Sequence, residues 1–127
     1  MTAEDQIALV TRYFTAVDAE DLPGVLATLT EDCCFTVETH GVVLNGTDEI
    51  SGMLKRLWAN HKAVRHHQFR YVADPLAERI AAQFLVENTE HDGSLTHKSN
   101  CNFFDIRNGR FSRVSVYMAG ANTLEQE

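Results

Sequence analysis

The chain has 127 residues, of which 44% are hydrophobic and 23% are charged, an ordinary composition for one folded domain spanning residues 1–127. Its 18 acidic and 11 basic residues give a net charge of −7, which argues against nucleic-acid or anionic-membrane partners. No apolar run approaches the ~20 residues of a membrane span, and the polar N-terminus is unlike a secretion signal. We therefore predict a cytoplasmic protein with reduced cysteines at positions 33, 34 and 101.

An amphipathic helix is predicted over residues 3–18. The sequence Thr2-Ala3-Glu4-Asp5 matches a capping box at its start. Behind it, apolar residues recur at spacings of three and four, the period of one helix face: Ala3, Ile7, Val10, Phe14 and Val17. Asp21 is positioned to cap a second, short helix that has Pro23 in its first turn.

A hairpin and a third helix are predicted next. Residues 34–38 alternate in the manner of a strand, His40-Gly41 is a turn, and residues 42–44 form a short return strand. The third helix opens at residues 46–49 with acidic side chains in its first turn, where the helix dipole favours them. Its buried stripe is expected to be Ile50, Met53, Leu54, Leu57 and Trp58.

The remaining chain is predicted to form four strands, over residues 64–73, 77–91, 94–106 and 110–119. Asp92-Gly93 is typical of a two-residue hairpin turn, which would place Glu87 opposite Lys98 as an oppositely charged cross-strand pair. The residues after Gly120 are polar and are predicted to form a loose tail.

The predicted order separates helices from an antiparallel sheet, which defines an α+β fold. Short motifs stand at its helix ends and turns: Arg12-Tyr13, Val17-Asp18, Glu31-Asp32, Gly46-Thr47-Asp48-Glu49-Ile50 and Asn108-Gly109-Arg110-Phe111. In this order and spacing the chain resembles the nuclear-transport-factor-2-like (NTF2-like) superfamily, and more narrowly the SnoaL-like polyketide cyclases and ketosteroid isomerases. The resemblance covers nearly the whole chain. It implies a cone-shaped fold in which a curved antiparallel sheet wraps around three helices and leaves a pocket at the open end.

The resemblance to ketosteroid isomerase extends to one tyrosine but not to its acids. Tyr13 stands four residues before Val17-Asp18, as the oxyanion-binding tyrosine of that enzyme does. The resemblance implies that its hydroxyl donates to a developing enolate, although Tyr13 could instead pack beside the apolar stripe. Val37 takes the place of the isomerase's general base and Asn100 that of its second acid. We therefore do not expect ketosteroid isomerase activity.

The polar residues of this chain resemble those of another member of the superfamily, scytalone dehydratase, more closely. Asp18 and Asn100 would be the counterparts of its aspartate and asparagine. Its histidine would correspond to His66 or His67. An Asp–His pair can orient an imidazole as a general acid or base near neutral pH. The second tyrosine and second histidine of that enzyme have no clear counterpart.

The sequence leaves the orientation of His66 and His67 open. Neighbours in a regular strand point to opposite faces, and the pattern favours His67 inward because it shares a face with Phe69 and Tyr71. Alignment with the family through Arg65 favours His66 instead. The six histidines lack the spacing of common metal motifs and no Gly-rich loop follows a strand, so no metal or nucleotide cofactor is expected.

These residues leave two main functions open. The first is a cofactor-free isomerase, cyclase or dehydratase that acts by acid–base catalysis on a small, largely apolar, oxygenated molecule. Its catalytic residues would be Tyr13, Asp18, His66 or His67, and Asn100, with Trp58, Asn102, Phe104 and Met118 binding the ligand. The second is a non-catalytic domain that binds a ligand in the same pocket. A pocket histidine within hydrogen-bond reach of Asp18 would favour the first.

Two expectations concern the faces of the sheet. The resemblance to the family implies that the even-numbered face of strand 94–106, which carries Asn100 and Asn102, lines the pocket across from Tyr13 and Asp18. We choose this face although hydrophobicity favours the odd-numbered one, with Cys101 and Phe103. The other face should carry exposed apolar side chains, so we predict a homodimer packed sheet to sheet. A third possible role is a dimerising module in which that interface is the whole function.

Overall fold

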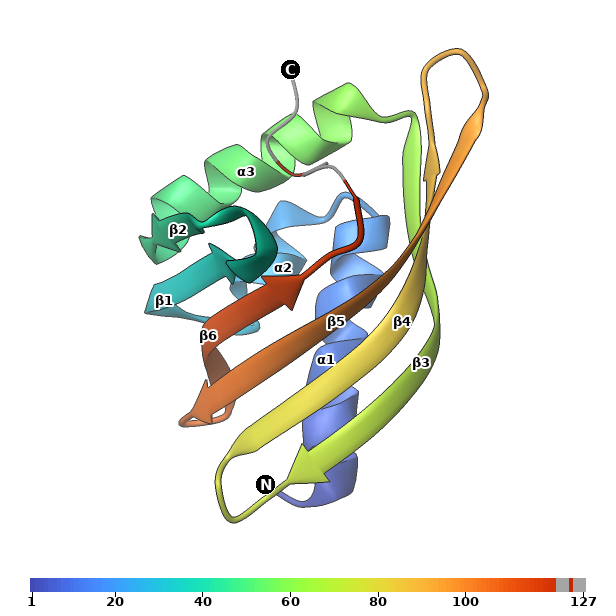
Figure 1. Ribbon diagram of the computed structural model, residues 1–127. Coiled ribbons are helices and arrows are strands. Elements are labelled where there is room, and N and C mark those ends of the chain that lie inside the picture. The colour runs from blue at the N-terminus through green and yellow to red at the C-terminus, as the bar shows by residue number, and fades with distance from the viewer. Residues whose placement is uncertain (121–123, 125–127) are drawn as a thin grey trace.

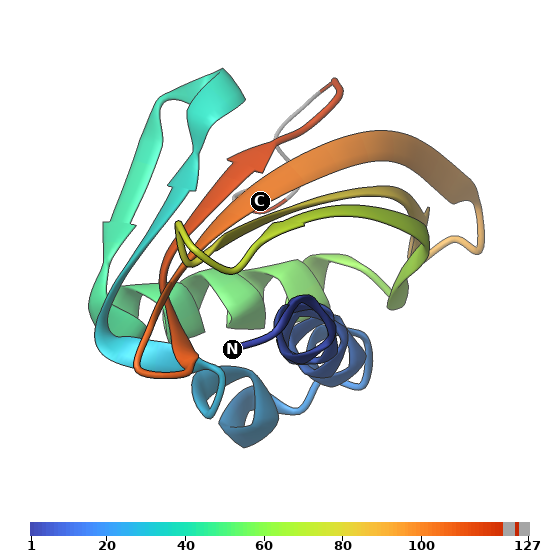
Figure 2. The same ribbon diagram turned by 90° about the horizontal axis from the view of Figure 1, so that it is seen from below.

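The computed structural model describes residues 1–120 and Leu124, and it confirms the predicted α+β fold (Figure 1). The elements, in chain order, are α1 (Ala3–Asp18), α2 (Leu22–Leu26), β1 (Leu29–Val37), the 3-10 helix η1 (Glu38–His40), β2 (Val42–Asn45), α3 (Gly46–Asn60), β3 (Ala63–Asp74), β4 (Arg79–Thr89), β5 (Leu95–Arg107) and β6 (Arg110–Tyr117). The sheet arches over α1 and α3, which produces the expected cone (Figure 2). Apart from Leu124, the predicted tail lies outside the described residues.

The six strands are ordered β2-β1-β6-β5-β4-β3 across the sheet. Neighbouring strands are antiparallel except β1 and β6, which run parallel, so the sheet is mixed. The parallel pair arises because α3 and four strands separate β1 from β6 in the chain, which allows a long crossover. Helix α1 packs on β3 and α3 packs on β1. None of the helices in the described part of the chain has the length and apolar character needed to cross a bilayer.

The predicted helix caps are present. Asp5 N–H donates to Thr2 Oγ1 at 3.1 Å, and Thr2 N–H donates to Asp5 Oδ2 at 3.0 Å, which completes the capping box of α1. The Asp21 carboxylate accepts the Gly24 N–H at 3.0 Å at the start of α2. The short turn between these helices leaves Asp18 at the end of α1, where the helix approaches β3.

The β4–β5 hairpin differs from the predicted register by one residue. Glu90 N–H donates to Ser94 O at 2.8 Å, so the loop that these residues close holds three residues instead of two. Val86 consequently pairs with Lys98, and the predicted pairing of Glu87 with Lys98 is wrong. Because of this shift, even-numbered residues of both strands share the inner face of the sheet.

This register decides which side chains are buried. Phe84 and Phe104 face inward and are 2% and 0% exposed, whereas Phe103 faces outward and is 39% exposed. Asn100 and Asn102 also lie on the inner face and are buried. The inner face of β5 therefore carries both apolar core residues and buried amides.

A β-bulge in β3 changes which of its residues face inward. The pairing with β4 shifts between His67 and Arg70, and Gln68 adopts a φ of +56°. His66 faces the interior before the bulge, and Phe69 packs against the core after it. The alternation that favoured His67 fails because the strand contains an extra residue.

A cluster of aromatic rings fills the interior beside α1. The Phe104 and Phe111 ring centroids lie 4.5 Å apart, and the Tyr13 ring lies 5.8 Å from Phe104 and 5.9 Å from Phe111 in edge-to-face contact. Such contacts favour one fixed ring orientation in addition to burying apolar area. The cluster therefore holds the middle of α1 against the sheet.

Candidate functional site

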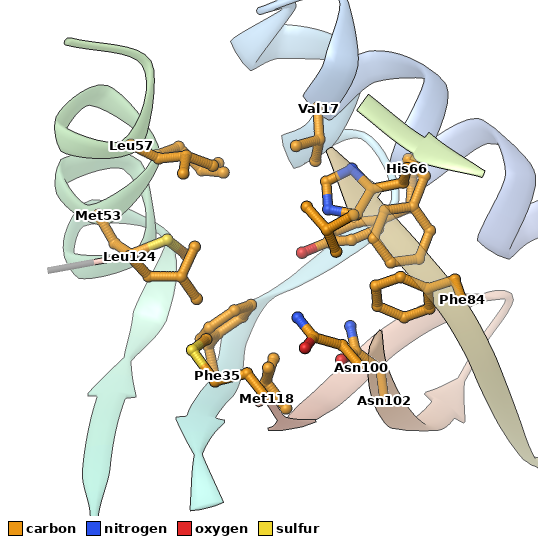
Figure 3. A pocket seen from close by; sticks show the side chains of 15 residues that line it. Val17, Phe35, Met53, Leu57, His66, Phe84, Asn100, Asn102, Met118 and Leu124 are labelled. Carbon is orange, nitrogen blue, oxygen red and sulfur yellow. The ribbon is translucent and has the colours of Figure 1, made fainter. Parts of the chain in front are cut away.

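A pocket with a free volume of about 50 Å³ lies between α1, α3 and the inner face of the sheet (Figure 3). Most of its lining is apolar: Phe14, Val17, Phe35, Met53, Leu54, Leu57, Phe84, Val86, Val116, Met118 and Leu124. Four polar side chains join them: Tyr13, His66, Asn100 and Asn102. An apolar cavity with a few converging polar groups is the usual form of a small-molecule site.

His66 is held by both oxygens of the Asp18 carboxylate. The His66 ring Nδ1 lies 2.6 Å from Asp18 Oδ1, and the His66 backbone N–H donates to Asp18 Oδ2 at 2.8 Å. The two bonds fix the position and the orientation of the imidazole, which reaches into the pocket from β3 (Figure 3). In the neutral ring, an Nδ1 proton donated to the carboxylate leaves the lone pair on Nε2, the form needed in a general base.

Tyr13 combines a packed ring with a hydroxyl group in the pocket lining. Its side chain is 4% exposed, and no described residue forms a hydrogen bond with its hydroxyl. Burial, and secondarily the nearby Cys33 thiol, raise the pKa of Tyr13. The hydroxyl therefore stays protonated at neutral pH and is a hydrogen-bond donor to a group in the pocket.

Two amides of β5 face the pocket. The Asn100 Oδ1 atom accepts the Ala119 N–H at 3.0 Å, which holds the chain after β6 close to the pocket. Asn102 is 3% exposed, and its Oδ1 has no hydrogen-bond partner among the described residues. A buried polar atom without a partner is destabilising, which is understandable where a ligand or water completes its hydrogen bonds.

Four residues expected in the site lie outside the pocket lining, and of these Asp18 forms a hydrogen bond with a polar lining residue, His66, through its side chain. Phe104 belongs to the aromatic cluster, and His67 follows His66 on the strand and points to the other face. Trp58 is half-buried on α3, and its Nε1–H donates to the Val17 carbonyl at 2.9 Å. Trp58 thus supports the last turn of α1, which carries Asp18, from outside the pocket. Met118 lines the pocket as expected.

Several lining residues were not recognised in the sequence. Met53, Leu54 and Leu57 were expected to be buried, but a hydrophobic helix stripe has the same pattern whether it faces a core or a pocket. Leu124 gave no signal because it is a single apolar residue in a polar stretch. In the folded chain it packs against the core and lines the pocket.

Two other histidines bind helix carbonyls. His61 Nδ1 lies 2.9 Å from Leu57 O, and His91 Nε2 lies 2.7 Å from Ala59 O, so both rings cap the last turn of α3. Within residues 1–120 and 124, no three His, Cys, Asp or Glu side chains gather as metal ligands would. The polar groups that line the pocket are suited to hydrogen bonding and proton transfer.

The sequence of residues 10–114 matches the SnoaL-like domain, and this match covers most of the chain, including Asp18, His66 and both pocket amides. The chain belongs to the SnoaL-like family. No curated protein sequence matches this family member.

Solved structures share the SnoaL-like fold over nearly the full length. A candidate polyketide cyclase from Xanthomonas campestris is 22% identical, with 91% of this chain and 90% of that chain covered and a TM-score of 0.82. Another, from Silicibacter sp. TM1040, is 24% identical, with 100% and 98% covered and a TM-score of 0.78. TerC, co-crystallised with polyporic acid, is 14% identical, with 91% and 92% covered and a TM-score of 0.78. At these identities the likeness establishes the fold alone.

Proposed function

We propose that this SnoaL-like protein binds a small, largely apolar, oxygenated molecule in its pocket and acts on it by cofactor-free acid–base catalysis. The reaction is an isomerisation, a cyclisation or a dehydration, each of which moves protons without a redox change. His66 exchanges a proton with the substrate through Nε2, and Asp18 orients the ring and stabilises its protonated form. Tyr13 and Asn100 interact with a substrate oxygen that gains charge in the transition state.

The observation that carries this proposal is the contact between Asp18 and His66. A carboxylate that accepts both the ring Nδ1–H and the backbone N–H of one histidine leaves a single ring nitrogen for the pocket. A domain that only buries an apolar ligand has no need for an oriented imidazole. General acid–base catalysis needs one, because efficiency depends on the position of the proton-transfer atom.

The size of the pocket limits how a ligand binds. An apolar cavity of about 150 Å³ binds benzene, whereas this pocket offers about 50 Å³. A ligand with one or more rings therefore enters only when part of the wall moves. Met118 and Leu124, which follow the last strand, are the lining residues whose displacement disturbs the sheet least.

A ligand screen followed by a proton-exchange assay tests the proposal. Polycyclic ketones and phenols are screened by thermal shift, and solvent deuterium incorporation into a bound ketone such as 1-tetralone is then followed by NMR. We expect exchange with the wild type and its loss in His66→Gln. The matched control is His67→Gln, which alters the neighbouring ring outside the pocket and should leave exchange unchanged. Equal exchange in all three proteins would exclude His66 as the base.

A non-catalytic binding role is the alternative, and the buried Val37 favours it. This residue stands where the ketosteroid isomerases resembled by the sequence carry their base, and it is 1% exposed among core residues. In that role the pocket amides recognise the ligand and His66 is a further hydrogen-bonding group. Tight binding of screened ligands, with neither deuterium exchange nor product formation, would support this alternative.

We also propose that the chain forms a homodimer through the outer face of the sheet. Exposed apolar side chains gather on this face: Val72, Leu85, Phe103 and Tyr117. The Phe103 and Tyr117 rings are in edge-to-face contact, with centroids 6.0 Å apart, so they form a continuous patch. Light scattering at micromolar concentration should give the mass of two chains, and Phe103→Asp should reduce it to one. A monomeric wild type would exclude this assembly.

A further inference from the structure

The last turn of α1, which carries Asp18, ends in a strained cap. The Asp21 N–H donates to the Ala16 carbonyl at 2.9 Å. The Glu20 N–H donates to the Val17 carbonyl at 3.1 Å, which completes the two bonds of a Schellman motif. Glycine usually takes the left-handed position of this motif, but here Glu20 adopts it with a φ of +55°. The cap by itself therefore holds the turn less firmly than a glycine cap would.

A second element holds the same turn. The Trp58 indole Nε1–H donates to the Val17 carbonyl at 2.9 Å, so this carbonyl accepts one bond from its own helix end and one from α3. Trp58 is half-buried and packs against the core, and it follows Leu57, which lines the pocket. Val17 lines the pocket from α1 (Figure 3). The indole therefore connects the two helices that flank the pocket.

This connection is one residue away from the Asp18 carboxylate. Asp18 directly follows Val17, and its two oxygens lie 2.6 Å from the His66 Nδ1 atom and 2.8 Å from the His66 backbone nitrogen. Hydrogen bonds weaken steeply as their geometry departs from linear. A rotation of the last turn of α1 would therefore change the orientation of the imidazole even if the rest of the fold were unaltered.

We propose that Trp58 is a positioning residue for proton transfer by His66. Its indole N–H fixes the Val17 carbonyl and with it the last turn of α1, so that Asp18 keeps the imidazole in one orientation and one tautomer. This inference rests on the proposed acid–base function and adds to it a residue from outside the pocket lining. A ring that only filled space at this position would stabilise the fold without any dependence of His66 on the N–H group.

The single tryptophan of the chain makes it possible to change the indole N–H alone. A tryptophan-auxotrophic host can replace Trp58 by benzothienylalanine, in which sulfur takes the place of the N–H group. The shape of the bicyclic ring is kept and the hydrogen-bond donor is lost. The matched control is 5-fluorotryptophan, which is also a substituted residue but keeps the N–H.

Two measurements follow the effect. Deuterium incorporation into 1-tetralone at saturation should be about tenfold slower with benzothienylalanine than with fluorotryptophan, because displacing a catalytic group by 1 Å can cost about 100-fold. The ketone concentration at half-saturation should not change. In long-range ¹H–¹⁵N spectra of the histidine-labelled protein, the neutral His66 ring should appear as the Nδ1–H tautomer in the control and as a mixture of tautomers with benzothienylalanine. The His66 signals are those that disappear in His66→Gln.

The two measurements separate this inference from the function on which it rests. Exchange by the wild type, with equal rates in the two substituted proteins, would overturn the positioning role and leave the proposed function standing. Slower exchange with unchanged His66 signals would also overturn it, because the effect would not pass through the contact with Asp18. If the wild type does not exchange the ketone, the proposed function fails, and the His66 spectra alone decide whether Trp58 orients the imidazole.

Discussion

The two halves of the inner face of β5 differ sharply although they belong to one strand and both are buried. The first half carries Lys98, Asn100 and Asn102, and the second carries Phe104 and Ile106. The second half packs into the aromatic cluster, whereas Asn102 in the first half lacks a partner for its buried oxygen among the described residues. Burial alone therefore does not identify a stabilising residue, and this strand gives up stability where it borders the pocket.

Removing the Phe104 ring from the second, packed half of β5 is the strongest test of this difference. Phe104→Ala leaves a cavity in the aromatic cluster and should lower the free energy of unfolding by about 3–5 kcal/mol. Urea denaturation measures the change. Phe103→Ala is the matched control, because it removes the same ring from the exposed face of the same strand and should cost less than about 1 kcal/mol in the monomer. Similar losses in the two variants would contradict the assignment of a packed half.

The polar residues around the pocket, which border the first half of β5, should respond in activity rather than in stability. Asp18→Asn removes the charge that stabilises a protonated His66, so turnover of an identified substrate should fall by about 100-fold. Steady-state kinetics checks this, with Glu20→Gln as a control that removes an exposed carboxylate from the neighbouring turn. Unchanged turnover in Asp18→Asn would leave the carboxylate with a purely structural role.

Tyr13 of α1 contacts Phe104 in the packed half through its ring and also lines the pocket, so one substitution can compare the two regions. Tyr13→Phe keeps the ring against Phe104 and Phe111 but removes the hydroxyl from the pocket. We expect unfolding free energy to change by less than about 1 kcal/mol, while kcat falls by at least about tenfold with little change in KM, because the hydroxyl acts on transition-state charge. A rise in KM at constant kcat would instead indicate ground-state binding.

The smallest expected effect has the opposite sign. The Asn102 amide has a buried oxygen without a described partner, and Asn102→Leu replaces this amide by an apolar side chain of similar size. The substitution should therefore stabilise the fold by about 1 kcal/mol and weaken ligand binding. Asn88 is the matched control: it is 1% exposed, neither of its amide atoms has a described partner, and it lies outside the pocket lining. Asn88→Leu should raise stability similarly without affecting binding. Destabilisation by Asn102→Leu would show that its amide is satisfied in the free protein.

The sequence predicted most elements because capping residues and hydrophobic period are local signals. The start of α1 and the stripe of α3 follow directly from them. The register of β4 and β5 did not, because Asp92-Gly93 suits loops of two or three residues and the sequence alone does not choose between them. The same slip assigned Lys98 to a partner, Glu87, that faces away from it.

The site was harder to predict than the fold because its geometry depends on distant segments. Asp18 and His66 are 48 residues apart in the chain, and only the docking of α1 on β3 brings them into contact. Leu124 reaches the pocket although its sequence neighbours are polar. Trp58 matched an aromatic pocket residue by type, but its indole N–H binds the end of α1 instead.

The bulge at Gln68 divides β3 into two segments that are out of phase with each other. Before it, even-numbered side chains such as His66 point inward, and after it the odd-numbered Phe69 and Tyr71 do. The strand can therefore present a titratable ring and an aromatic wall on one side although their sequence spacing is odd. Because the two segments are out of phase, the orientation of His66 and that of Phe69 and Tyr71 can change independently. Deleting Gln68 would leave a regular strand with the histidine and both aromatic rings still on one side, whereas straightening the bulge without a deletion would turn Phe69 and Tyr71 toward solvent.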